Sequence, residues 1–67
     1  MKRIHVNGEE RQFDGIELLP ELLTKMGLNA AYLAVAINDK VIPRSEHPST
    51  KVADGDRVEV IHAVGGG

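Results

Sequence analysis

Residues 57–64 have the sequence RVEVIHAV, which is the most β-prone stretch of the chain and its clearest indication of a β-sheet. Val58 and Val60 alternate with Glu59 and Ile61, and this period of two is typical of a β-strand with two different faces. We expect Val58 and Val60 to face a buried core and Ile61 to lie on the opposite face. A strand so rich in β-branched residues is suited to a buried place in a sheet.

The opening of the chain supplies a neighbour for that strand. Ile4 and Val6 alternate with polar residues, again as in a half-buried strand. Asn7-Gly8 follows directly, and this pair favours the type I′ turn of a β-hairpin because both residues tolerate a positive φ. The return strand is expected over residues 10–13, with Phe13 facing the core. The first and last strands can then pair in parallel at the centre of one sheet.

The middle of the chain predicts one short amphipathic helix over residues 19–26. Pro20 suits its first turn and Gly27 its C-terminal end. Its apolar stripe consists of Leu19, Leu22, Leu23 and Met26.

Two further strands are expected after the helix. Leu33, Val35 and Ile37 alternate with alanines, and a short strand at residues 41–42 ends at a proline, which cannot donate to a ladder. The polar residues 44–51 predict a loop.

This order of elements predicts an α+β fold. A hairpin, a helix across one sheet face and then further strands give a mixed sheet of four or five strands that grips one main helix, which is the β-grasp arrangement. We expect this domain to occupy residues 1–64, and residues 65–67 to form a flexible C-terminal glycine tail.

Composition restricts the classes of function. The chain has 67 residues, no cysteine, a formal net charge of −2 and only two aromatic residues. It therefore offers nucleic acid neither a basic stripe nor a stacking platform, and no apolar run approaches the roughly 18 residues of a membrane span. We expect a cytoplasmic monomer that binds neither nucleic acid nor a membrane.

The chemistry is expected at the tail, Gly65-Gly66-Gly67. Glycines are costly to order and add nothing to a core, so the tail does not serve the fold. A tail without side chains can thread a narrow channel and present the carboxylate of Gly67 to ATP. Attack on the α-phosphate would give an acyl-adenylate, and a sulfur nucleophile could then displace AMP and leave a thiocarboxylate. Taken alone, however, three terminal glycines are more simply a frayed end.

The side chains suggest no competing site. His5, His47 and His62 lack metal-ligand spacing and are expected to be solvated, so we predict no metal site. No carboxylate pair or hydroxyl has the context of a catalytic group, so we predict no catalytic side chain and no bound cofactor.

A partner-binding surface is expected on the open sheet face beside the tail. The alternation that turns Val58 inward leaves Ala34, Ala36, Ile61 and Ala63 on the opposite face, and Val64 adjoins the tail. The residues expected to bind a partner are Ala36, Ile61, Ala63 and Val64. Exposed apolar patches commonly mark binding surfaces. The alternative is a register shifted by one residue, which would exchange the two faces.

Five segments form a specific set in this order, although each is common alone: LPELL at 19–23, VAIN at 35–38, VIPR at 41–44, DGDRVE at 54–59 and AVGGG at 63–67. Over nearly the whole chain they resemble the ThiS family of ubiquitin-like sulfur carriers in the thiamin pathway. The resemblance implies a ubiquitin-like β-grasp fold and a protein that is a co-substrate rather than an enzyme. Gly66 and Gly67 match the family's diglycine, with Gly67 bearing the sulfur, whereas Gly65 stands where relatives tend to have a larger polar residue.

The resemblance also implies partners. A ThiF-like adenylating enzyme would activate Gly67 with Mg-ATP, a donor such as a cysteine desulfurase would supply sulfur, and a ThiG-like thiazole synthase would receive it. The molybdopterin carrier MoaD and the tRNA-thiolation carriers share the fold and the tail, so these pathways stay open. So do a ubiquitin-like modifier joined to lysines and a pure interaction module. The Pro43-Arg44 segment and the short chain favour the thiamin branch.

Overall fold

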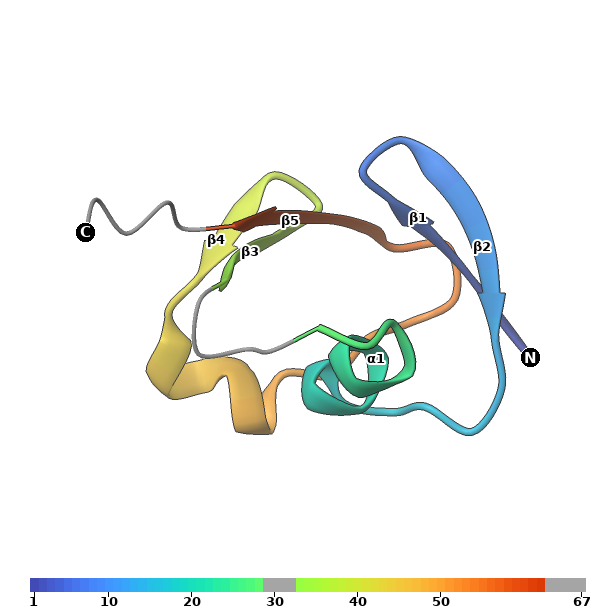
Figure 1. Ribbon diagram of the computed structural model, residues 1–67, viewed down its shortest axis with the longest axis horizontal. Coiled ribbons are helices and arrows are strands. Elements are labelled where there is room, and N and C mark those ends of the chain that lie inside the picture. Colours follow the sequence, from blue (N-terminus) through green and yellow to red (C-terminus); the bar gives the residue numbers. More distant parts are fainter. Residues whose placement is uncertain (29–32, 63–67) are drawn as a thin grey trace.

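A five-stranded sheet and a layer of helices make up the part of the chain that the computed structural model describes, residues 1–28 and 33–62. Figure 1 shows the sheet on one side and the helices packed against one of its faces. In chain order the elements are β1 (Lys2–Val6), β2 (Glu9–Phe13), α1 (Leu19–Lys25), β3 (Leu33–Ile37), β4 (Lys40–Ile42), the 3-10 helix η2 (Arg44–Ser49) and β5 (Arg57–His62).

The central strand of the sheet is β5, in the order β2-β1-β5-β3-β4. It pairs in parallel with β1, where Val6 lies opposite Val58, and antiparallel with β3, where Val35 lies opposite Val60. The outer strands β2 and β4 join their neighbours as antiparallel hairpins. The structure therefore confirms the predicted α+β β-grasp fold with its mixed sheet, including the parallel pairing of the first and last strands.

Both hairpins turn on residues in the left-handed region. Asn7 and Gly8, between β1 and β2, have φ angles of 51° and 83°. Asn38 and Asp39, between β3 and β4, have φ angles of 51° and 68°. Two consecutive positive φ angles characterise the type I′ turn, so the turn predicted at Asn7-Gly8 is confirmed.

Helix α1 is short, but side chains and backbone define both of its ends. Pro20 lies in the first turn, where its missing N–H leaves no bond unmade. Glu21 Oε1 accepts hydrogen bonds from the backbone N–H groups of Leu18 at 2.9 Å and Glu17 at 3.0 Å. These bonds, chiefly the one from Leu18, lower the pKa of the Glu21 carboxyl because they favour its charged form. Gly27, with a φ of 72°, follows the end of the helix.

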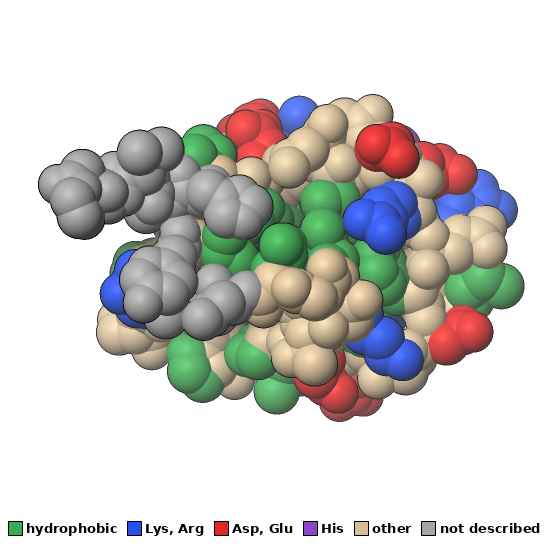
Figure 2. All heavy atoms as spheres, viewed as in Figure 1, with side chains coloured by type: hydrophobic (Ala, Val, Ile, Leu, Met, Phe, Trp, Pro, Cys, Tyr) green, Lys and Arg blue, Asp and Glu red, His purple; other side chains and the backbone are tan. Residues whose placement is uncertain are grey.

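One hydrophobic core lies between the sheet and the helices. It contains residues of the helix stripe and of the alternating strands, as their patterns predict, namely Leu22, Leu23, Val35, Ile37, Val58 and Val60. The other buried apolar residues are Ile4, Val6, Phe13, Ile16, Leu19, Leu33 and Val52. Figure 2 shows hydrophobic side chains gathered between the two layers, with charged side chains around them. The register predicted for the strands is therefore correct.

The segment after β4 differs from the predicted loop. Arg44–Ser49 forms the helix η2, which packs against α1. The hydroxyl of Thr50 donates to the carbonyl oxygen of Glu46 at 2.6 Å, and the N–H of Leu19 donates to the carbonyl oxygen of Thr50 at 2.8 Å. The polar residues that suggested a loop thus complete the backbone hydrogen bonding of a helical turn and join it to the start of α1.

Burial of His47 in η2 contradicts the prediction of a solvated histidine at this position. The side chain is 4% exposed, and its Nε2 lies 3.1 Å from the carbonyl oxygen of Ile42. Helix η2 brings the imidazole to the backbone of β4, which supplies a hydrogen-bond partner. His5, in contrast, is half-exposed on β1, as a strand histidine with one face to solvent should be.

The cap at Glu21 predicts an acid-sensitive contribution to stability. A carboxyl whose pKa is lowered by folding stabilises the protein above the ordinary carboxyl pKa, and this contribution is lost as the pH falls through the lowered value. We expect Glu21→Gln to have a lower Tm than the wild type at pH 7, and the difference to shrink toward pH 2. Thermal unfolding across this pH range measures it. The control is Glu9→Gln, on the exposed edge strand β2, which should show the wild-type dependence of Tm on pH. A wild-type pH dependence of Tm in Glu21→Gln would contradict the assignment.

Candidate functional site

The site predicted from the sequence belongs to the C-terminal end of β5. The tail residues 65–67, together with Ala63 and Val64, lie outside the described residues, so the roles predicted for them stay predictions. The described part of the site is β5 and the sheet face around it. The last described residue, His62, belongs to the central strand rather than to an edge of the sheet.

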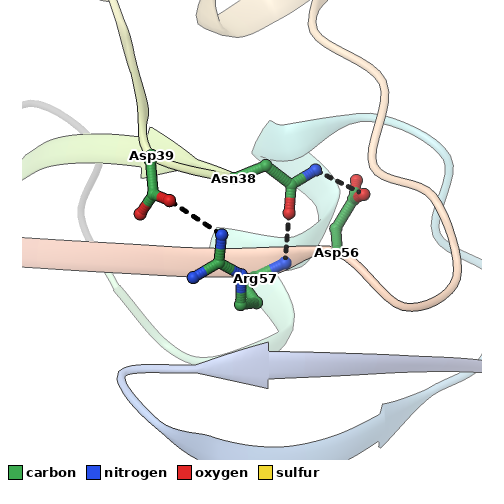
Figure 3. Close-up of polar contacts among 4 residues, drawn as sticks. All are labelled: Asn38, Asp39, Asp56 and Arg57. Atoms are coloured by element: carbon green, nitrogen blue, oxygen red, sulfur yellow. Dashed lines mark hydrogen bonds and ion pairs between the residues drawn. The ribbon is translucent and has the colours of Figure 1, made fainter.

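The start of β5 is fixed by the turn between β3 and β4 (Figure 3). The side chain of Asn38 accepts a hydrogen bond from the backbone N–H of Arg57 at 2.9 Å and donates one to Asp56 Oδ1 at 3.0 Å. Arg57 Nη2 donates to Asp39 Oδ2 at 2.8 Å. The hydrogen bond with Asp39 and then its charge raise the pKa of Arg57, so the guanidinium stays charged. These contacts determine where the strand begins.

The later part of β5 is held from its other side by Asn7. The backbone N–H of Asn7 donates to the carbonyl oxygen of Val58 at 2.9 Å. Its side-chain Oδ1 accepts from the N–H of Val60 at 2.8 Å, and its Nδ2 donates to the carbonyl oxygen of Val60 at 3.2 Å. Each hairpin turn therefore has an asparagine at its first position whose side chain binds β5, Asn7 from the side of β1 and Asn38 from the side of β3.

An apolar patch lies on the open face of the sheet beside the C-terminal half of β5. The strand register places Ala34 opposite Ile61, and Ala36 opposite both Val41 and Glu59. Ile61 is 61% exposed and Val41 is 72% exposed, so each presents a β-branched side chain to solvent. We call Ala34, Ala36, Val41 and Ile61 the open-face patch. Of the residues predicted to bind a partner, Ala36 and Ile61 lie together in it.

Val41 is a member of this patch that the sequence analysis did not identify. The signal that could have found it is the two-residue turn Asn38-Asp39, because so short a turn fixes the register of β4 against β3. In that register Val41 lies across from Ala36 and shares its face.

The remainder of the open face is polar. Arg3 and His5 alternate with the buried residues of β1, and Gln12 and Glu10 lie opposite them on β2. His5 Nε2 lies 3.6 Å from Glu10 Oε1, in a contact that is ionic when the imidazole is protonated. The exposed Arg57 continues this polar area onto β5. The open face is thus divided into an apolar part near the end of β5 and a polar part near its start.

Other kinds of site find little support in the described part of the chain. Within residues 1–28 and 33–62, no group of three potential metal-ligating side chains comes together. Over the same residues, no helix has both the length and the apolar character needed to cross a membrane. A shallow groove on the open face is lined partly by His5, Asn7, Arg57 and Glu59, a mixed set that includes both charges.

Comparison with known proteins adds a family to this geometry. The model of the ThiS family matches residues 4–67. A sulfur carrier protein, ThiS, from Thermus thermophilus is 36% identical over 64 residues, which cover 96% of this chain and 98% of that protein. The crystal structure of a thiamine biosynthesis protein, ThiS, from Geobacter metallireducens superposes with a TM-score of 0.82 at 37% identity, covering 97% of this chain and 99% of that chain.

Longer proteins contain a similar segment. A thiazole synthase from Paramagnetospirillum magneticum is 34% identical over 65 residues, and one from Magnetococcus marinus is 32% identical over the same length. The matches cover 97% of this chain, but the chain spans only 20% of each of these two proteins.

Proposed function

Because the chain belongs to the ThiS family, we propose that it is a sulfur carrier for thiamin biosynthesis and that the carboxyl group of Gly67 carries the sulfur. The observation that carries the proposal is the extent of the family match, which includes the three glycines together with the folded domain. The similar protein from Thermus thermophilus, of nearly the same length, is named a sulfur carrier protein.

The proposed chemistry takes place at backbone atoms. An oxygen of the Gly67 carboxylate attacks the α-phosphorus of Mg-ATP, a C–O–P linkage forms, and pyrophosphate leaves. Hydrosulfide then attacks the acyl carbon and AMP leaves; a persulfide donor would do the same and need a reducing thiol to release the product. The resulting thiocarboxylate donates sulfur for thiazole formation. The partner enzymes supply the catalytic groups, so this chain is a co-substrate.

The described fold suits such a carrier. Strand β5 is bonded to β1 near its start and to β3 along its length, which gives the tail a firm base. Residues 63–67 follow that strand and could extend by up to about 17 Å, at roughly 3.3–3.6 Å per residue. A glycine segment of this length could enter a channel that is too narrow for side chains.

We propose that the open-face patch docks this carrier on its partners. Ala36 and Ile61 are its predicted contacts, and Ala63 and Val64 are expected to extend it toward the tail. A ThiF-like adenylating enzyme and a ThiG-like thiazole synthase are the proposed partners, with a donor such as a cysteine desulfurase. Two thiazole synthases that contain a segment similar to this chain support the second partner, because there carrier-like and synthase sequences share one polypeptide.

The position of the terminal carboxylate is the first test. We expect deletion of Gly67, or addition of one glycine after it, to abolish sulfur loading of the 67-residue chain. Reacting atoms must approach to roughly 3–3.5 Å, and an error of about 1 Å can cost a hundredfold in rate. One residue moves the carboxylate by about 3.3–3.6 Å. Pyrophosphate release with a ThiF-like enzyme, and intact mass after addition of a sulfur source, measure loading.

A matched control adds one glycine before Met1, which is 80% exposed. This variant has the length and composition of the extended chain but leaves the carboxylate in place, so it should load like the wild type. All variants should keep the wild-type Tm because no core residue is altered. Loading of the shortened chain at the wild-type rate would show that Gly67 is not the sulfur-bearing residue. Ligation to protein amines instead of oxygen-to-sulfur exchange would favour a ubiquitin-like modifier.

The docking surface is the second test. Ile61→Asp and Ala36→Asp should each weaken binding to the adenylating enzyme by about tenfold or more, because an unpaired carboxylate would lose its water in the interface. Gln12→Asp places the same side chain on the polar part of the same face and should leave the affinity unchanged. Titration calorimetry gives the affinities, and unfolding curves check that the fold persists. Wild-type affinity in both patch variants would exclude the patch from docking.

A further inference from the structure

We propose that Asn7 is a positioning residue for the tail, because its side-chain amide continues strand β1 past the point where the backbone turns away and holds β5 as far as Val60. The inference rests on the proposed sulfur-carrier function, since it concerns how Gly67 is delivered to a partner.

In the hydrogen bonding between β1 and β5, the side-chain amide of Asn7 takes the place of backbone groups of β1. In a parallel pair, one residue donates its N–H to the partner strand and accepts through its C=O from a residue two positions further along that strand. Asn7 obeys the first half of this rule, because its N–H donates to the carbonyl oxygen of Val58 at 2.9 Å. At Asn7 the chain enters the hairpin with a φ of 51°. The acceptor for the N–H of Val60 is then the side-chain Oδ1, at 2.8 Å.

The same amide makes a second bond in the next ladder position. Nδ2 of Asn7 donates to the carbonyl oxygen of Val60 at 3.2 Å, a bond that a longer β1 would supply from a backbone N–H. Both bonds are partly buried, so their loss would leave two backbone groups poorly satisfied. Within residues 1–28 and 33–62, they are the last hydrogen bonds that β5 receives from the side of β1.

The two bonds from the Asn7 side chain lie at the point where β5 changes from pairing with strands on both sides to pairing with β3 alone. Ile61 and His62 pair with β3, opposite Ala34 and Leu33, and have no counterpart on β1. Without the Asn7 amide, Val60 would also be bonded to β3 alone. A longer segment would then have to become ordered when the carboxylate enters a partner's site. Ordering each extra residue costs conformational entropy. The fraction of docked carriers with Gly67 in reach of ATP should therefore fall.

Asn38 provides a matched control within the same molecule. It occupies the same first position of a two-residue turn, has the same φ of 51°, and also binds the backbone of β5 through its side chain. Its bond is to Arg57, at the start of the strand and away from the tail. Glycine tolerates a positive φ, so Asn7→Gly and Asn38→Gly keep both turns and remove only the side-chain bonds.

The experiment measures pyrophosphate release by a ThiF-like adenylating enzyme as the concentration of each carrier variant is raised. For Asn7→Gly we expect kcat to fall about tenfold, as loss of two hydrogen bonds of ordinary strength allows, with KM changed by less than about threefold. For Asn38→Gly both constants should stay within about twofold of the wild type, at a similar loss of Tm. Asn7→Asp keeps an acceptor for the N–H of Val60 but no donor for its carbonyl oxygen, so its kcat should lie between wild type and Asn7→Gly.

Amide hydrogen exchange gives a readout that does not depend on loading. The N–H of Val60 should exchange faster in Asn7→Gly than in the wild type, and at the wild-type rate in Asn38→Gly. Equal losses of kcat in the two glycine variants would reduce Asn7 to a general stabilising role, and wild-type kcat in Asn7→Gly would overturn the proposal. Should Asn7→Gly not fold, wild-type kcat in Asn7→Asp would overturn it in the same way. If the wild-type chain itself is not adenylated, the proposed function fails, whereas faster exchange at Val60 in Asn7→Gly than in the wild type would still establish the Asn7 hydrogen bonds.

Discussion

The parallel pairing of β1 and β5 at the centre of the sheet determines the path of the chain around it. Two parallel strands cannot be joined by a tight turn, so the chain between them must cross from one end of the sheet to the other. Here that crossing includes α1 and η2, and their layer covers the apolar face of the two central strands (Figure 1). The remaining strands extend the sheet outward from this pair, β2 beyond β1, and β3 and β4 beyond β5.

The turn asparagines give this small domain long-range contacts at little cost in chain length. A domain of 67 residues has a modest core, and no disulfide is available to supplement it. Asn7 and Asn38 each tolerate the left-handed conformation that a hairpin requires, and each also bonds with its side chain to β5, which is distant in sequence. Local turn chemistry and tertiary organisation are therefore coupled in single residues. A glycine at either position would satisfy the turn alone.

Most of the fold could be predicted because strand faces are strictly constrained by the alternation of side chains. A shift of one residue in β5 would have buried Glu59 and exposed Val58, so the pattern admits only one register. The helix η2 could not be predicted, because its polar residues and Pro48 are typical of loops and its packing against α1 depends on tertiary structure. The burial of His47 follows from that packing. Val41 and the amide of Asn7 were missed for a related reason: their importance depends on which residues lie opposite them on other strands.

The proposed function places the reactive group beyond a central strand, so that one stretch of backbone would couple recognition to chemistry. The strand that contributes Ile61 to the open-face patch is the one that leads to Gly67, six residues later. A shift of β5 by one residue against β3 would turn Ile61 to the other face and move the tail by about 3.3–3.6 Å. A partner that bound the open-face patch in the proposed way would therefore also fix the position of the Gly67 carboxylate relative to its own site. Under the proposed function, the Asn7 hydrogen bonds near the end of β5 would therefore matter beyond stability, because they would set the distance between the surface that a partner recognises and the atom on which it would act.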